Sequence, residues 1–436
     1  MRHSTLCRKL WLTLLLIIPL QMMAAELGEA GKRLAALPGI TGVETLKSTH
    51  FPEKYVFFIN QQLDANDPSK GNFEQRVVLC HKGFDRPTVI VTEGYNANYA
   101  LRESYIEELS KLFDTNIICA EYRYFGKSMP EGRNWYYLTV VNSLYDLHNI
   151  NRTLRAMYSG KWISTGISKG GQTTMFYRSY FPDDVDISVP YVAPLNRSVE
   201  DGRHEKFLRH QVSTKKNRQK VLDFQLLLFQ RKAELMPMLK DYCDKMHYTF
   251  KVPLEEIFDF SVLEYSFAFW QWGYDIDKIP SSSASSEQLF KYWMNISDPN
   301  YFSTQNIHIS FNVQAAKELG YYGYCTKPFR KYLSIDTAKG YLKRLMLPAD
   351  AEDTAFSPDL YKHTLAYLKQ NDPKMIYIYG DIDPWSASGI YGLPFTKHKQ
   401  NLQVYMLPGG SHRTRIMSFP ESTREEIIRP IEDWLK

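Results

Sequence analysis

Up to residue 196, short apolar runs alternate with stretches in which apolar residues recur every three or four positions. The runs at 55–59 and 75–80 flank a turn-forming stretch and predict an antiparallel strand pair. The run at 88–92 consists of β-branched residues, which is typical of a strand buried on both faces. The elements expected after it are helices at 101–113 and 140–158 and strands at 116–121, 162–167 and 186–192. This alternation predicts a parallel sheet covered by helices on both faces.

The pattern changes between residues 197 and 365, where strand signals vanish and helical periodicity dominates. We interpret this segment as one inserted helical cap domain. Buried-strand runs and a closing helix then follow, at 375–380, 402–407 and 422–435. The sequence therefore predicts one α/β domain made of residues 26–196 and 366–436, with the cap inserted between its two parts.

The first 25 residues have the features of a secretory signal peptide. Arg2, Arg8 and Lys9 precede the apolar run 10–20, and small residues lead up to an expected cleavage after Ala25. This run is shorter than the ~20 residues that span a bilayer, so no membrane span is expected in the mature chain. We expect an exported protein, either periplasmic or extracellular.

Composition and charge exclude other classes. The 436 residues are 44% hydrophobic, which is enough for one large domain and a second. Removal of the signal peptide takes away three positive charges and lowers the net charge from +5 to +2. No basic footprint indicates a nucleic-acid partner.

Four cysteines remain in the mature chain and can pair in three ways, of which the sequence chooses none. Cys119 lies in an apolar run and is most simply a buried small hydrophobe. Cys243 and Cys325 lie in one region and are a possible pair. The cysteines and histidines show no metal-ligand spacing, so neither a metal nor a cofactor is expected.

The strand at 162–167 runs directly into Gly166-Ile167-Ser168-Lys169-Gly170, a Gly-x-Ser-x-Gly motif. In an α/β-hydrolase fold, the glycines of this motif allow a sharp turn from strand to helix that exposes the serine. Ser168 is the candidate nucleophile. The backbone N–H of Lys169 is a candidate oxyanion donor, whereas its side chain is expected to be solvated.

A nucleophilic serine needs a histidine base and a carboxylate that orients it, and α/β-hydrolases supply them in the order Ser, Asp, His. The loop after the strand 375–380 contains Asp381 and Asp383, and the loop after 402–407 contains His412. We prefer Asp383 because the proline that follows it holds it extended at a helix start. Asp381 is the alternative. These choices predict a triad of Ser168, Asp383 and His412.

The second oxyanion donor of this fold comes from the loop after the strand 88–92, where we expect the amide of Gly94 or Tyr95. Glu93 in the same loop would repel the developing negative charge unless a cation lies beside it. Two partners are possible, the α-ammonium group of a substrate or the guanidinium of Arg123. The sequence does not distinguish between them.

Three segments, 121–128, 166–171 and 381–385, resemble the secreted bacterial tripeptidyl aminopeptidase family, the PS-10 type of serine peptidase. More distantly, the chain is similar to prolyl carboxypeptidase and dipeptidyl peptidase II, which share the Asp-Pro-Trp loop. The resemblance implies that an acidic residue binds the free N-terminus of a peptide substrate. Glu93 is the first candidate for this role and Glu264 the second. Trp385 is then expected to line the pocket near the scissile bond.

The residues and the resemblance together predict a serine exopeptidase that releases short peptides, with tripeptides expected, through an acyl-enzyme. An esterase or lipase would use the same triad and remains an alternative, because this fold hosts many acyl substrates. A peptide-binding relative without catalysis is the third hypothesis. Retention of all three triad residue types argues against it.

Overall fold

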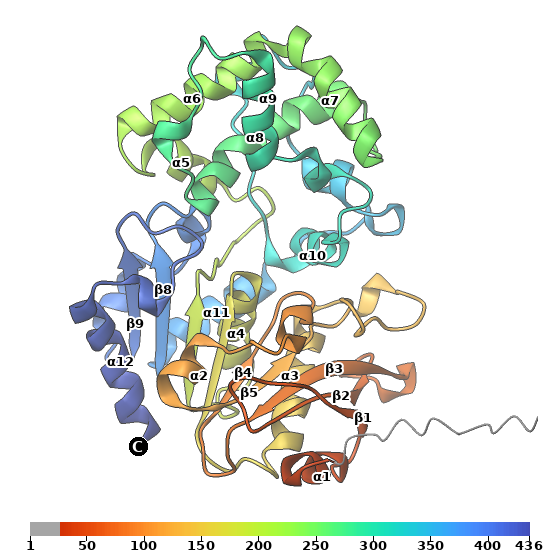
Figure 1. Ribbon diagram of the computed structural model, residues 1–436, viewed down its shortest axis with the longest axis vertical. Helices are drawn as coiled ribbons and strands as arrows, with labels where there is room; N and C mark the ends of the chain where they lie inside the picture. Colours follow the sequence, from red (N-terminus) through yellow and green to blue (C-terminus); the bar gives the residue numbers. More distant parts are fainter. Residues whose placement is uncertain (1–26) are drawn as a thin grey trace, which may run out of the picture.

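The computed structural model describes residues 27–436, so the predicted signal peptide lies outside the described residues. Figure 1 shows two parts of the molecule, a domain built around a sheet and a group of helices on one side of that domain. Within the described residues, no helix is long and apolar enough to cross a membrane.

Nine strands form one sheet in the order β1-β2-β3-β5-β4-β6-β7-β8-β9. The strands are β1 (Ile40–Thr45), β2 (Glu53–Gln62), β3 (Asn72–His81), β4 (Thr88–Val91), β5 (Asn116–Ala120), β6 (Trp162–Ile167), β7 (Ile187–Tyr191), β8 (Met375–Gly380) and β9 (Leu402–Leu407). The pairs β1·β2, β2·β3 and β3·β5 are antiparallel, and all later pairs are parallel. The antiparallel opening and the parallel body are both as predicted.

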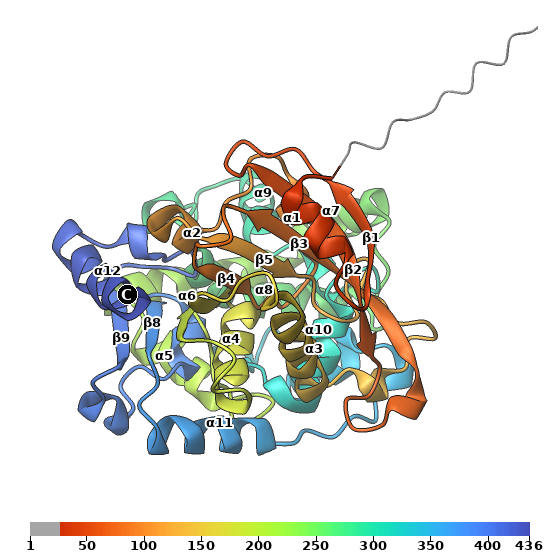
Figure 2. The ribbon, with the colours of Figure 1, turned by 90° about the horizontal axis from the view of Figure 1, so that it is seen from below.

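Helices cover both faces of this sheet (Figure 2). An apolar core lies between the sheet and the helices on each face. One core takes side chains from α1 (Glu29–Ala35), α3 (Val140–Leu154), α4 (Lys169–Tyr180) and α11 (Asp359–Gln370). The opposite core takes side chains from α2 (Glu108–Phe113) and α12 (Glu421–Leu435). This arrangement, with a strand–turn–helix at β6 and α4, is an α/β-hydrolase fold.

The cap is helical and has its own apolar core. Its helices are α5 (Gly202–His210), α6 (Lys215–Gln230), α7 (Lys232–Met246), α8 (Leu254–Trp272), α9 (Ser286–Ile296) and α10 (Ile309–Gln314). No strand occurs between 197 and 365. Helix α11 crosses the boundary predicted at residue 365 and packs against α4 of the sheet domain.

Two local expectations need correction, and one strand has no counterpart among the predicted elements. The helix expected at 101–113 is helical only in a short 3₁₀ turn at Asn98–Leu101 and in α2. The edge strand β1 carries no apolar alternation and was not expected. All four cysteines of the described chain are unpaired, so the considered pairing of Cys243 with Cys325 is wrong.

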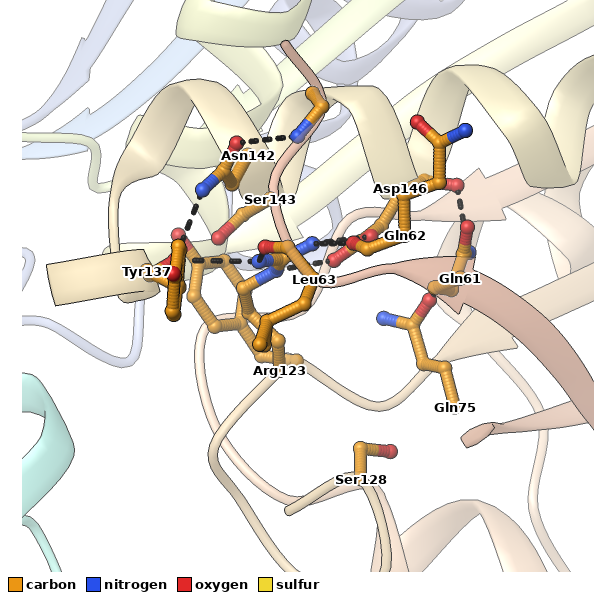
Figure 3. Close-up of polar contacts among 12 residues, drawn as sticks. Gln61, Gln62, Leu63, Gln75, Arg123, Ser128, Tyr137, Asn142, Ser143 and Asp146 are labelled. Atoms are coloured by element: carbon orange, nitrogen blue, oxygen red, sulfur yellow. Dashed lines mark hydrogen bonds and ion pairs between the residues drawn. The ribbon is translucent and has the colours of Figure 1, made fainter. Parts of the chain in front are cut away.

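A buried ion pair holds the loop after β5 against α3 (Figure 3). The guanidinium of Arg123 donates to both carboxylate oxygens of Asp146, at 2.6 and 2.7 Å. It also donates to the backbone oxygens of Gln62, Leu63 and Tyr137. Every donor group of this buried cation therefore has an acceptor, which is the condition under which a buried charge is tolerated.

Candidate active site

Ser168 stands at the turn between β6 and α4, with backbone angles of φ 59° and ψ −119°. A side chain at Gly166 would place its Cβ 2.4 Å from the carbonyl carbon of Gly170, and one at Gly171 would lie 2.5 Å from the Tyr191 oxygen. Larger residues would thus push strand and helix apart. The two glycines let the chain turn tightly enough to present Ser168 at the carboxyl end of the sheet.

Asp383 and His412 come together from the loops after β8 and β9. The Nδ1 atom of His412 lies 2.6 Å from Oδ2 of Asp383, and both residues are buried. The other carboxylate oxygen accepts the backbone N–H of Trp385 at 3.1 Å, which fixes its orientation. This pairing fixes the imidazole tautomer with hydrogen on Nδ1, which leaves Nε2 free to accept a proton.

Asp381 forms no hydrogen bond or ion pair with His412 in the described part of the chain. Its carboxylate accepts the backbone N–H of Gly409 at 2.6 Å and so ties together the two loops that carry Asp383 and His412. The cap also reaches this region, since the backbone N–H of His412 donates to the oxygen of Gln271 in α8 at 2.9 Å. The geometry favours Asp383 as the partner of the histidine.

A cavity of about 760 Å³ contains Ser168 and His412 in its wall. It lies between the sheet domain and the cap, because its lining comes from both. The predicted residues Glu93, Tyr95, Lys169, Glu264 and Trp385 also line it. The structure therefore brings these predicted site residues to one space.

The side chain of Lys169 is not solvated, which corrects the expectation from sequence. It is 2% exposed, and its Nζ donates to the backbone oxygen of Gly94 at 2.7 Å. The ammonium also lies 3.2 Å from the centre of the Tyr122 ring. Burial lowers the pKa of Lys169 well below its usual range. The nearby charges of Glu93 and Glu318 oppose this decrease.

Glu93 does not pair with Arg123, so that alternative is wrong: the guanidinium is fully used by Asp146 and three backbone oxygens. The carboxylate of Glu93 instead accepts the hydroxyl of Tyr99 and the backbone N–H of Gly94, the latter at 3.1 Å. Burial raises the pKa of Glu93, while hydrogen bonds and the charge of Lys169 oppose that rise. One of the amides expected to bind an oxyanion is thus engaged by Glu93.

Glu264 projects from α8 of the cap and has a different environment. Its carboxylate accepts the hydroxyls of Tyr322 and Tyr324 at 2.9 and 2.7 Å. Burial raises its pKa to about 8, and only these two hydrogen bonds counteract that effect. Among the described residues, no Lys, Arg or His forms an ion pair with Glu264.

Trp385 lies two positions after Asp383 and packs between the two domains. Its ring lies 5.1 Å from that of Phe267 in α8 and 5.4 Å from that of His204 in α5. The Nδ1 atom of His204 lies 2.9 Å from the oxygen of Pro384 in the same loop. The loop that carries Asp383 is therefore held by aromatic and polar contacts from the cap.

Comparison with known proteins identifies the family. The sequence model of the PS-10 peptidase S37 family matches residues 26–435. The chain belongs to the PS-10 peptidase S37 family. This membership confirms the resemblance stated from the three sequence segments, and the protein is a serine peptidase.

Individual relatives of this S37 peptidase span different parts of it. The prolyl tri/tetrapeptidyl aminopeptidase of Streptomyces mobaraensis is 29% identical over 416 residues, which cover 92% of this chain and 84% of the relative. The probable serine protease EDA2 of Arabidopsis thaliana is 28% identical over 155 residues, or 31% of this chain and 32% of the relative. The crystal structure of proline iminopeptidase from Mycobacterium smegmatis matches with a TM-score of 0.40 and 12% identity, covering 90% of this chain and 99% of that one. That structural likeness is too low to inform function.

Sequence reasoning about this S37 peptidase missed several residues of the cavity wall. Tyr301 from the cap lies there, and its hydroxyl bonds to those of Tyr321 and Tyr322. The cavity is also lined by Arg413 and Arg415, which lie one and three positions after His412. The sequence shows a tyrosine-rich stretch at 321–324, but no local pattern connects it with Glu264, about sixty positions earlier.

Proposed function

We propose that this S37 peptidase is an exported exopeptidase that releases short peptides, namely tripeptides, from free N-termini. The observation that carries the proposal is one cavity that holds Ser168 and His412 together with the buried carboxylate of Glu264, which has no cationic partner within residues 27–436. The Streptomyces relative, by its name a tri/tetrapeptidyl aminopeptidase, supports the same reaction class.

The proposed mechanism proceeds through an acyl-enzyme. Ser168 Oγ attacks the scissile carbonyl carbon while Nε2 of His412 accepts the hydroxyl proton, and Asp383 stabilises the imidazolium that forms. The amide of Lys169 and one amide of the Gly94–Tyr95 loop bind the oxyanion. The histidine then protonates the departing amine, and a water molecule, deprotonated by the same histidine, hydrolyses the ester.

We propose Glu264, rather than the first sequence candidate Glu93, as the anchor for the substrate ammonium group. Glu93 already accepts a hydroxyl and a backbone amide and lies near the charge of Lys169. Glu264 accepts only two tyrosine hydroxyls, so its charged form is poorly stabilised when the cavity is empty. A substrate ammonium would supply the missing charge, and its distance from Ser168 would set the number of residues released.

Matched peptides with free and acetylated N-termini test this function directly. We expect fragments of uniform length from the free peptide alone, as read by mass spectrometry, with the Ser168→Ala protein as the blank. Equal cleavage of both peptides would contradict the exopeptidase. If neither peptide is cut but a short-chain acyl ester is hydrolysed in a Ser168-dependent manner, the esterase alternative is correct.

Replacing Glu264 with glutamine should lower kcat/KM for free peptides by about 100-fold, because the substrate charge would lose its buried partner. In the wild type, kcat/KM should rise as pH increases through the pKa of about 8, where Glu264 becomes ionised. It should fall again as the substrate amine, with an ordinary pKa of about 8, loses its proton. The variant should lose the rising limb that belongs to Glu264.

Glu93→Gln is the matched comparison for Glu264→Gln, measured on the same peptides. If Glu264 is the anchor, only its variant should bring the rate on free peptides down toward that on acetylated ones. The opposite result, a loss of N-terminal discrimination in Glu93→Gln alone, would assign the anchor to Glu93. Thermal unfolding of both variants checks that the cap remains folded.

Export is part of the same proposal and is supported by the signal-peptide features of residues 1–25. Expression of the full chain in a bacterium with a secretion system should give a mature protein that begins at Glu26. N-terminal sequencing of the exported fraction measures this. Retention of the uncleaved chain in the cytoplasm would contradict it.

A further inference from the structure

We infer that the buried side chain of Lys169 is a positioning residue for the oxyanion hole: it fixes the backbone of the loop that supplies the second donor. The inference rests on the proposed serine peptidase mechanism and extends it to a side chain that this mechanism does not use. Lys169 would then serve twice, through its amide as an oxyanion donor and through its ammonium as a clamp on the opposite loop.

The contact between the two donor segments is unusually close. A Cβ at Gly94 would lie 2.7 Å from both Cβ and Cγ of Lys169 and 2.9 Å from the backbone nitrogen of Gly170. The loop after β4 therefore lies directly on the first turn of α4. Such an approach leaves no room for water between them, so the Gly94 oxygen depends on the protein for its hydrogen bond.

Lys169 provides that hydrogen bond at 2.7 Å from Nζ to the Gly94 oxygen. The ammonium has no carboxylate within ion-pair distance among the described residues. It lies instead on the Tyr122 ring, with the rings of Phe125 and Tyr95 at 5.4 and 5.7 Å. Burying a lysine in this way is costly unless the group has a task, because an apolar side chain would fill the same volume more cheaply.

The orientation of one peptide group shows what the clamp accomplishes. In the planar trans peptide between Gly94 and Tyr95, the carbonyl oxygen and the N–H point in opposite directions. Anchoring the oxygen on Lys169 thus turns the Tyr95 N–H away from the buried ammonium. Tyr95 and Glu93 both line the cavity that contains Ser168.

The Tyr95 amide is therefore the second donor that this arrangement favours. A second contact supports its position, since the Tyr122 backbone N–H donates to the Tyr95 oxygen at 3.1 Å. During the reaction the substrate oxygen would accept the Tyr95 N–H, while the Glu93 carboxylate keeps the Tyr99 hydroxyl and the Gly94 amide as partners. Without the Lys169 bond, the Gly94–Tyr95 peptide is free to rotate and the donor loses its preset direction.

Lys169→Met tests the inference, because methionine fills most of the lysine volume and cannot donate a hydrogen bond. We expect kcat to fall on the order of 100-fold, the effect of losing one oxyanion donor, with KM changed by less than about threefold because ground-state binding is retained. The melting temperature should stay the same or rise, since a buried polar group is removed. Lys169→Gln is measured as well, in case the methionine variant does not fold.

Lys54→Met is the matched control. Lys54 is 1% exposed and its Nζ donates to the backbone oxygen of Arg102 at 2.6 Å, which is the same kind of interaction outside the cavity wall. This control should keep the wild-type kcat. The inference is overturned if Lys169→Met keeps kcat within about threefold of wild type, or if both variants lose activity and stability in parallel, as a purely structural role predicts.

The rate of inactivation by diisopropyl fluorophosphate separates this inference from the proposed peptide specificity. The reagent phosphorylates Ser168 through a transition state whose phosphoryl oxygen occupies the oxyanion hole, and it needs no peptide anchor. If the reagent inactivates Lys169→Met more slowly than the wild type, the positioning role of Lys169 is supported. If the wild type in the same experiments cleaves no peptide, the proposed exopeptidase function is overturned while that role stands. A wild type that neither reacts with the reagent nor cleaves peptides would overturn both.

Discussion

Replacing Ser168 with alanine should lower kcat for peptide cleavage by about five to six orders of magnitude and leave the fold intact. The loss is this large because the acyl-enzyme cannot form without the hydroxyl, and only the oxyanion donors and substrate binding remain. Alanine meets the same backbone angles as serine at this turn, so the change adds no new steric demand. Steady-state cleavage of a free peptide and thermal unfolding measure the two parts of the prediction.

Ser164→Ala is the control for this experiment. Ser164 lies on the same strand, β6, and its hydroxyl donates to Ser188 on β7 at 2.9 Å. Its loss should cost about 1 kcal/mol of stability, the typical contribution of one hydrogen bond, and leave kcat unchanged. Cleavage by Ser168→Ala above 1% of the wild-type rate would show that another group is the nucleophile.

The sequence predicts the turn at Ser168 well because its causes are local. Gly166 and Gly171 are required by contacts with Gly170 and Tyr191, which lie within the adjoining helix and the neighbouring strand. The β-branched run of β4 predicts burial for an equally local reason. The loops after β8 and β9 could be placed on the same edge as Ser168, since parallel strands end together.

The partners of buried charges could not be predicted in this way. The sequence predicts a solvated Lys169 side chain, but the Gly94 backbone covers it from a loop 75 positions earlier in the chain. The sequence leaves Arg123 as a possible partner of Glu93, but the guanidinium binds Asp146 of α3 (Figure 3). A sequence shows which charges exist and where strands end. It does not show which side chain lies next to a given buried carboxylate in the folded protein.

The sequence leaves Asp381 and Asp383 as alternatives for the same reason, because it does not show which carboxylate pairs with His412. Replacing each aspartate with asparagine distinguishes between them. Asp383→Asn should lower kcat by about 10⁴-fold. The amide can no longer accept from Nδ1 of His412 if its nitrogen faces the ring, so the imidazole is held in the tautomer that carries hydrogen on Nε2. That histidine cannot accept the Ser168 proton. The remaining amide oxygen can still accept the Trp385 N–H, so we expect the fold to persist.

Asp381→Asn provides the contrast, because the asparagine oxygen can keep the 2.6 Å bond from the Gly409 N–H. Its kcat should stay within about threefold of wild type, since the tautomer of His412 is unaffected. Kinetics of both variants on one free peptide give the comparison, with proton NMR of the imidazole N–H as a direct view of the Asp383 bond. A large loss in Asp381→Asn with little change in Asp383→Asn would reverse the assignment. The loop after β8 would then have to turn its other carboxylate toward His412 during the reaction.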